Sequence, residues 1–379
     1  MARARTGSVA HSHAGPARGR TPDYFLFAVI AALALFGIAM LASASSSLGK
    51  VQFNNTYYYL EHQLLYGFSL GAAGFIFGYF FPYRHWKKVA LPLLSVAVAA
   101  LVLVFTPLGH AASGSSRWLR LGPLSFQPAE FAKFALIIYL SAWLSNAKFN
   151  RATDFRSGFV PFLAIIGVMG GLLLLQPATS TVVILIASGL IVYFMSGAPF
   201  RYILLAAVLG IASIGLLVLA TPYRRARILG FLHQSAYTQG LNYQLNQSLI
   251  AIGSGGITGV GYGQSASKGA YLPDAVDDSI FAIVAEELGF IGAVALVALF
   301  ATFAFRMFLL ARRAADKFGR SLLVGFGSVI ALQAFINMAA TSGLIPLTGV
   351  PLPFVSYGGT ALAIFLTMSG ISLNVSKYS

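Results

Sequence analysis

Residues Gly253–Gly289 read GSGGITGVGYGQSASKGAYLPDAVDDSIFAIVAEELG. A glycine-rich loop leads to three acids, Asp274, Asp277 and Asp278, and an apolar run that contains two glutamates follows at once. The whole chain holds only 10 Asp and Glu residues, so half of its acids fall within this stretch. We therefore interpret the rest of the chain as a scaffold that holds an acidic loop at the mouth of a helix.

Composition places that scaffold in a membrane. Of the 379 residues 58% are hydrophobic and 9% are charged, whereas soluble domains average about 25% charged residues. Several apolar runs reach the roughly 20 residues that a bilayer-spanning helix needs. The sequence predicts an all-α polytopic membrane protein, with a disordered basic cytoplasmic tail over residues 1–22 and one membrane domain over 23–379. The absence of cysteine excludes a disulfide framework and a thiolate metal site.

About ten transmembrane helices fit the apolar pattern. The first run is longer than the roughly 7–15 apolar residues of a signal peptide, which favours an uncleaved helix over a cleaved signal. The predicted spans are Tyr24–Ala42, Gln63–Phe81, Val89–Phe105, Ala129–Leu144, Phe159–Leu175, Thr181–Ser196, Tyr202–Leu219, Ile280–Phe305, Leu322–Thr341 and Ala361–Val375.

The distribution of basic residues predicts the orientation. With a cytoplasmic N-terminus, 17 of the 25 Lys and Arg residues lie in inner segments, and an even number of spans makes the C-terminus cytoplasmic as well. This bias explains the net charge of +15 without nucleic acid as a partner. It also predicts that residues 221–279, between helices seven and eight, form a long extracytoplasmic loop, and long loops are usually functional.

Two further outer segments are unusually polar at the points where the chain enters the membrane. In Ser113–Lys133, Glu130 and Lys133 stand at helical spacing i and i+3, so their side chains can pair. Thr341–Thr360 carries three prolines and four glycines, which predicts an irregular, re-entrant segment. Such backbone is tolerated at membrane depth where it is buried in protein or lines a water-filled cavity, so we expect a cavity that opens to the outside.

A series of short motifs runs through these segments and beyond them. They are Arg117-Trp118, Leu121-Gly122, Phe126–Glu130 with Lys133, Tyr223–Arg225, Arg227–Leu229, Tyr243–Leu245, Gln247–Gly256, Leu272–Ala275, Asp278 with Ile280–Ala282, Ala285–Gly289 and Gly349–Gly359. In this order they resemble the SEDS family (shape, elongation, division and sporulation proteins) of RodA, FtsW and SpoVE. The resemblance runs from about Tyr24 to Ser376 and is nearer to the FtsW/SpoVE branch.

The resemblance implies a peptidoglycan glycosyltransferase of the bacterial cytoplasmic (inner) membrane, acting in cell division or shape. Such an enzyme polymerises lipid II into glycan strands at the outer face, releases undecaprenyl pyrophosphate, and works with a class B penicillin-binding protein, a transpeptidase, in the division or elongation machinery. The family's essential aspartate falls on Asp278. The chain departs from the family pattern at Val276-Asp277, where His-Thr is usual, and at Ala178, where an aspartate is usual.

The chemistry predicts roles for the polar residues. A sugar hydroxyl needs a general base, worth about 10²–10⁴ in rate, and we assign this role to Asp278. A single catalytic carboxylate favours inversion at the anomeric carbon. The leaving pyrophosphate needs positive charge, from arginines or from backbone N–H groups of the glycine-rich loop. The predicted substrate-binding residues are Lys133, Glu130, Arg117, Gln127, Arg224, Arg227, Gln247, Ser248, Ser356 and Glu286.

Alternatives stay open at this point. Asp278 needs a cationic partner to stay ionised, either Lys133 or an arginine of the long loop, and a divalent cation (Mg²⁺ or Mn²⁺) is the other possibility. Asp278 could instead cap the next helix. Glu130 and Lys133 are equally well explained as a structural ion pair. A flippase for the lipid-linked precursor and a non-catalytic scaffold for the transpeptidase are the competing functions.

Overall fold

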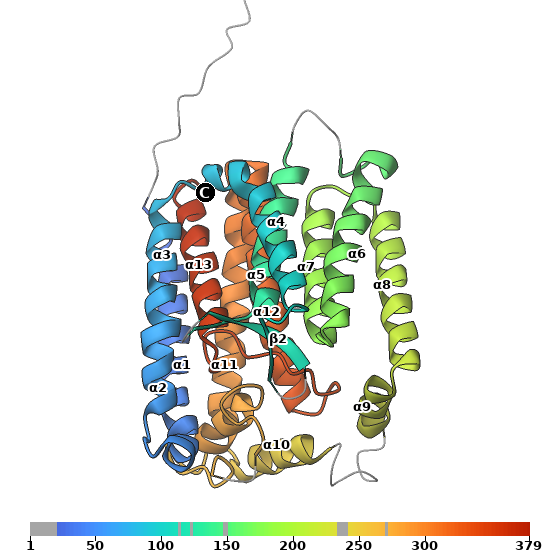
Figure 1. Cartoon of the computed structure of the whole chain (residues 1–379). Helices are drawn as coiled ribbons and strands as arrows, with labels where there is room; N and C mark the ends of the chain where they lie inside the picture. The colour runs from blue at the N-terminus through green and yellow to red at the C-terminus, as the bar shows by residue number, and fades with distance from the viewer. Residues whose placement is uncertain (1–20, 113–114, 122–123, 147–150, 233–241, 270–271) are drawn as a thin grey trace, which may run out of the picture.

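The computed structural model describes residues 21–112, 115–121, 124–146, 151–232, 242–269 and 272–379, so nearly all of the predicted tail lies outside the described residues. The described chain is a helical bundle with one small sheet (Figure 1). Its elements are α1 (Tyr24–Phe53), α2 (Tyr58–His62), η1 (Gln63–Phe68), α3 (Ser69–Phe80), η2 (Tyr83–His85), α4 (Trp86–Leu103), β1 (Gly109–Ala112), β2 (Ser115–Leu121), β3 (Leu124–Phe126), α5 (Pro128–Leu144), η3 (Phe155–Phe159), α6 (Val160–Leu175), α7 (Thr179–Met195), α8 (Phe200–Ala220), α9 (Pro222–Leu232), α10 (Tyr243–Ser254), α11 (Ile280–Arg313), α12 (Lys317–Thr341) and α13 (Gly359–Ser376).

The predicted spans all fall on helices. Eight helical stretches of the described chain are long and apolar enough to cross a membrane. The predicted spans in α5 and α7 coincide with helices of 17 residues each, which is short for a crossing. The chain is therefore a polytopic helical membrane protein, and the count of ten crossings stays a prediction.

The strands depart from the all-α prediction. Strands β1, β2 and β3 form an antiparallel sheet in the order β1-β2-β3, within a segment that the sequence marked only as polar. In β2, Leu119 is buried while Arg120 is exposed, which is the alternation of a strand with one covered face. The sheet leads directly into α5, and residues of β2 and β3 line the cavity described below.

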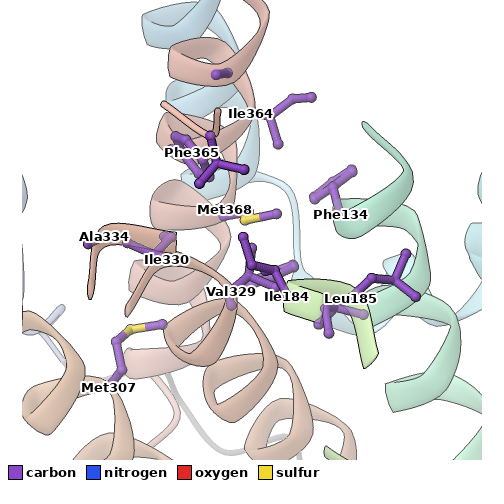
Figure 2. Close-up of a cluster of buried hydrophobic side chains, with 14 of the residues drawn as sticks. Phe134, Ile184, Leu185, Met307, Val329, Ile330, Ala334, Ile364, Phe365 and Met368 are labelled. Atoms are coloured by element: carbon purple, nitrogen blue, oxygen red, sulfur yellow. The ribbon is translucent and has the colours of Figure 1, made fainter. Parts of the chain in front are cut away.

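Helices α12 and α13 are the most buried of the candidate membrane spans. In their apolar windows 78% and 72% of the residues are buried, against 6% for α8, which stands at the edge in Figure 1. Figure 2 shows the core that α12 and α13 share with α5, α7 and α11, to which Phe134, Val329 and Phe365 belong. On another side α13 packs closely on α3, where a Cβ at Gly74 would lie 2.1 Å from the Thr367 hydroxyl oxygen. Small residues permit this approach between helices in a membrane.

Helix α11 is broken near its start. Gly289 has φ 66° and ψ −167°, outside the helical region, so Ile280–Leu288 forms a short first segment. The backbone of the glycine-rich loop lies in this break. The N–H groups of Val260 and Gly261 donate to the carbonyls of Glu286 and Glu287, at 3.0 and 3.1 Å. The loop thereby supplies hydrogen bonds that a continuous helix would make for itself.

Candidate active site

The acidic turn before α11 is held by its backbone. Asp274 adopts a left-handed conformation (φ 49°), and its carbonyl accepts hydrogen bonds of 3.1 Å from the N–H groups of Asp277 and Ser279. The Asn337 side-chain amide of α12 donates to the carbonyl of Asp278 at 2.9 Å and to that of Val350 at 2.8 Å. One amide thus joins the acidic turn to the segment between α12 and α13.

The side chain of Asp278 is directed away from a capping role. The N-cap position of α11 is Ser279, and no side-chain hydrogen bond caps the helix there. A Cβ placed on Gly349 would lie 3.4 Å from Asp278 Oδ2, so the carboxyl lies against the backbone of the irregular segment. The absence of a side chain at position 349 leaves room for this carboxyl.

A cavity of about 1160 Å³ opens beside the turn. Asp274, Asp277 and Asp278 lie on its surface. The other described lining residues belong to α2, η1 and α3, to β2, β3 and α5, to the turn before α7 and α7 itself, to α8, α9, α10, α12 and the start of α13, and to residues 345–349 with Pro351. The sequence predicted such a cavity from the prolines and glycines of Thr341–Thr360, and several residues of that segment do line it.

Four arginines line the cavity: Arg117, Arg120, Arg224 and Arg227. Three of them are held by backbone carbonyls. Arg117 donates to Gln176 and Pro177, at 3.1 and 2.8 Å, Arg224 donates to Leu174 at 2.8 Å, and Arg227 donates to Leu347 at 3.2 Å. A guanidinium carries five N–H donors, so each of these groups can hold a phosphate while it stays anchored.

The two neighbouring carboxyls have different electrostatic surroundings. Burial raises the pKa of Asp278 to about 6 and the charge of Asp274 adds to the rise, while Arg227 and Arg117 oppose it. Burial also raises the pKa of Asp277 well above its ordinary value, and the charges of Asp278 and Asp274 add to that rise. The two arginines therefore favour the ionised form of Asp278.

Lys133 and Glu130 do not reach this cavity. Lys133 Nζ lies 2.8 Å from Glu130 Oε1 and donates to Gln333 Oε1 of α12, and both charged side chains are almost fully buried in the bundle. The structure thus places them as an internal ion pair. Of the two cationic partners expected for Asp278, the loop residue Arg227 acts on it and Lys133 is engaged elsewhere.

Glu286 is also occupied inside the protein. Its carboxylate accepts from the Ser265 hydroxyl at 2.6 Å and from the N–H groups of Ala266 and Ser267. The adjacent Glu287 pairs with Lys268 at 3.2 Å and accepts from Ser43 of α1. These two glutamates fasten the glycine-rich loop to α11 and α1.

The other predicted contacts divide in the same way. Gln127, with Arg117, Arg224 and Arg227, lines the cavity. Gln247, Ser248 and Ser356 are not among the described lining residues. The hydroxyl of Ser248 donates to a carbonyl of its own helix, and that of Ser356 donates to the Asp277 carbonyl. Ser356 therefore stabilises the backbone of the acidic turn through a hydrogen bond.

The glycine-rich loop packs closely on α11. The N–H groups of Val260 and Gly261 donate to carbonyls of α11. A Cβ on Gly259 would lie 2.1 Å from the Glu287 carbonyl oxygen, so glycine is required here by the close approach to α11. Helix packing accounts for this glycine, and phosphate binding by the loop stays a prediction.

Sequence reasoning missed three polar residues of the cavity, His62, Asn337 and Tyr357. The Tyr357 hydroxyl and His62 Nδ1 share a hydrogen bond of 2.9 Å, and both residues line the cavity with Asn337. The available signal was a histidine and an asparagine within apolar helical stretches, since polar residues in membrane spans usually serve a function.

Comparison with known proteins agrees with this architecture. The sequence model of the cell cycle proteins FtsW, RodA and SpoVE matches residues 23–379. The chain belongs to this family. Among its relatives, a Saccharophagus degradans protein named probable peptidoglycan glycosyltransferase FtsW is 39% identical over 349 residues, which cover 91% of this chain and 90% of that one. Stage V sporulation protein E of Bacillus subtilis is 37% identical, over 95% and 98% of the two chains.

Solved structures of family members share the fold. A chain from a peptidoglycan synthase complex, described as coordinating polymerisation and crosslinking, has a TM-score of 0.78 and 27% identity, and the match covers 94% of this chain and 99% of that one. RodA of Thermus thermophilus has a TM-score of 0.68 and 27% identity, over 94% and 96% of the chains. FtsW and SpoVE are the names of the two sequence relatives, in line with the branch that the motifs favoured.

Proposed function

We propose that this chain is a peptidoglycan glycosyltransferase that polymerises lipid II in the outer cavity, with Asp278 as the general base. The observation that carries the assignment is the position of Asp278, on the surface of a large cavity and under the influence of two anchored arginines. The name of the FtsW relative and the predicted outer location of the cavity support it.

The geometry suits a displacement with one base. Asp278 would take the proton of the attacking sugar hydroxyl as that oxygen bonds to the anomeric carbon of the donor sugar. The bond from that carbon to the pyrophosphate oxygen breaks in the same step, and the lipid pyrophosphate leaves. With a pKa of about 6, the carboxyl is ionised at pH 7.5 yet basic enough to accept a proton. Attack without a covalent intermediate inverts the anomeric centre.

The arginines suit the leaving group. Arg224 and Arg227 line the cavity on α9, and Arg117 lines it on β2. Negative charge grows on the pyrophosphate as the bond breaks, and anchored guanidiniums stabilise it without having to reorganise. Ile214 and Val218 of α8 line the cavity near these cations, and α8 is the helix most exposed to the surrounding lipid. A lipid chain can therefore leave the cavity along α8.

A resident metal is not needed by this scheme. Among the described residues no group of three or more His, Asp or Glu side chains is arranged to hold a metal ion. We assign charge neutralisation to the arginines, and a Mg²⁺ or Mn²⁺ ion would enter as the counter-ion of the substrate. We further propose a class B penicillin-binding protein as the partner, since the solved relative is part of a complex that couples polymerisation to crosslinking.

The test is polymer synthesis by the purified protein with its cognate transpeptidase. Lipid II is supplied to wild type, to Asp278→Asn and to Asp154→Asn, a control on an exposed turn that is not part of the described cavity. We expect glycan polymer from wild type and the control only. Equal polymer from Asp278→Asn would refute the base assignment and favour a scaffold. Absence of polymer from all three, with measured flipping of lipid II, would favour a transporter.

A further inference from the structure

Asp277 stands where the family motif has another residue, and the proposed reaction gives it no role. It nevertheless lines the cavity beside Asp278. The Val276 carbonyl accepts a hydrogen bond of 2.9 Å from the N–H of Tyr357. The acidic turn is therefore tied to the start of α13 immediately next to Asp277.

Aromatic side chains gather on this side of the turn. Tyr357 lies edge-on to Tyr59, with ring centroids 5.1 Å apart, and its hydroxyl bonds to His62 at 2.9 Å. His62 in turn contacts Tyr66, with ring centroids 4.6 Å apart. Asp277 lies close to both Tyr59 and Tyr357.

The cavity therefore has two chemically different ends. Arg224, Arg227, Ile214 and Val218 belong to α8 and α9, whereas His62 and Tyr357 come from α2 and the approach to α13. Figure 1 shows α2 and α13 on one side of the bundle and α8 and α9 on the other. Asp278 lies between these two ends, because the charge of Arg227 lowers its pKa and Asp277 precedes it in the chain.

The two ends of the cavity favour different ligands, an anion at the arginines and a neutral sugar at the aromatic side chains. A pyrophosphate is attracted by the guanidiniums, which form charge-assisted hydrogen bonds with phosphate oxygens. A pyranose ring is neutral, with hydroxyl and amide groups around its edge and C–H groups on its faces. Aromatic rings provide apolar faces for such a ring, and hydroxyl, imidazole and carboxyl groups provide hydrogen bonds to its edge.

We propose that Asp277, Tyr357 and His62 form a binding subsite for the N-acetylated sugar that brings the attacking hydroxyl, on the side of Asp278 opposite Arg224 and Arg227. This subsite rests on the proposed function and specifies where the two substrates of that reaction bind. The donor occupies the end of the cavity at Arg224 and Arg227 (the arginine end), and the acceptor occupies the end at His62 and Tyr357 (the aromatic end). In the subsite Asp277 acts as a neutral donor to the sugar, and Tyr357 and His62 orient the ring.

The experiment measures binding of two probes without turnover. The probes are di-N-acetylchitobiose, a neutral N-acetylated disaccharide, and farnesyl pyrophosphate, followed by ligand-observed NMR on the full chain in nanodiscs. The variants Asp277→Ala and Tyr357→Phe each remove hydrogen bonds at the aromatic end, and Arg224→Gln removes a cation. Tyr243→Phe, an exposed tyrosine outside the described cavity, is the matched control.

We expect a crossed pattern. Asp277→Ala and Tyr357→Phe should weaken disaccharide binding by about fivefold or more, the worth of one hydrogen bond, and leave farnesyl pyrophosphate binding within about twofold. Arg224→Gln should do the reverse, and Tyr243→Phe should change neither. Asp277→Asn keeps a neutral donor and should bind the disaccharide within about threefold of wild type.

Three results would overturn the subsite. One is no disaccharide binding to wild type at millimolar concentration, and another is an equal loss of disaccharide binding in Arg224→Gln. The third is Asp277→Asn binding as weakly as Asp277→Ala, which removes the neutral-donor role. Because neither probe reacts, a wild-type protein that makes no polymer would refute the proposed function and leave this test readable.

Discussion

Replacing Asp278 by asparagine is expected to abolish synthesis and to stabilise the fold at neutral pH. The pKa of this carboxyl is about 6 in the folded protein, against an ordinary value of 3.8. The folded state therefore holds the proton more tightly than the unfolded state does. This stabilising contribution is complete below about pH 3.8 and is lost as the pH rises through 6.

The size of the effect follows from that difference. About 2 pH units at 1.36 kcal/mol each correspond to roughly 3 kcal/mol. This is an upper bound, because the side chain is only half-buried and water screens its charge. Asparagine has the same shape and cannot ionise, so it avoids this cost above pH 6 and gains less than about 1 kcal/mol at pH 4.

Two assays on the same purified variant separate catalysis from folding. Glycan polymer from lipid II is expected to fall by about 10²–10⁴, the usual worth of a general base. The thermal unfolding midpoint is expected to rise above that of wild type at pH 7.5 and to approach it at pH 4. Polymer at the wild-type level, or a lowered midpoint at pH 7.5, would refute this reasoning, since the second result would indicate a structural carboxylate.

Three further changes test other parts of the site. The acid limb of the pH profile of kcat/KM is expected near pH 6. Arg227→Gln should move this limb to higher pH, because loss of a cation raises the pKa of Asp278. Polymer synthesis measured over a pH series gives the limb for wild type and variant, and an unmoved limb would exclude Arg227 as the partner of Asp278. Lys133→Met should lower stability by about 3–5 kcal/mol by leaving Glu130 unpaired in the bundle, and adding Glu130→Gln should restore most of the thermal midpoint unless the pair serves more than structure. Gly259→Ala should prevent folding, since its Cβ would lie 2.1 Å from a carbonyl oxygen of α11, whereas Gly253→Ala meets nothing within 4 Å and should gain about 0.5–1 kcal/mol in its helix; equal yields of folded protein would contradict the packing argument.

The helices could be predicted from the sequence because a membrane span is a local property. A run of apolar residues must satisfy its backbone within itself, so length and composition suffice to locate it. The sheet β1-β2-β3 could not be predicted in this way. Its strands are short, and their pairing depends on contacts between segments that the local residue pattern does not encode.

The residues of the candidate site were predictable in type and less so in direction. Helical spacing identified Glu130 and Lys133 as a pair, but a partner 200 residues further on, Gln333, draws the lysine into the bundle. Tyr357 and His62 are 295 positions apart, and their contact follows from how α2 packs against the approach to α13. A single sequence carries little information about which face of a helix a distant segment will cover.

The acids with which the glycine-rich stretch ends therefore divide by position along one short helical segment. Glu286 and Glu287 lie just before the break at Gly289, where they bind the glycine-rich loop, and neither is among the described residues that line the cavity. Asp277 and Asp278 lie at the other end of that segment, held by backbone contacts that leave both carboxyl groups on the cavity surface. The break frees this segment from the rest of α11, and the loop fastens it again through hydrogen bonds and two buried glutamates. A base mounted in this way keeps its position while a lipid-linked substrate enters and leaves beside it, which preorganised catalysis requires.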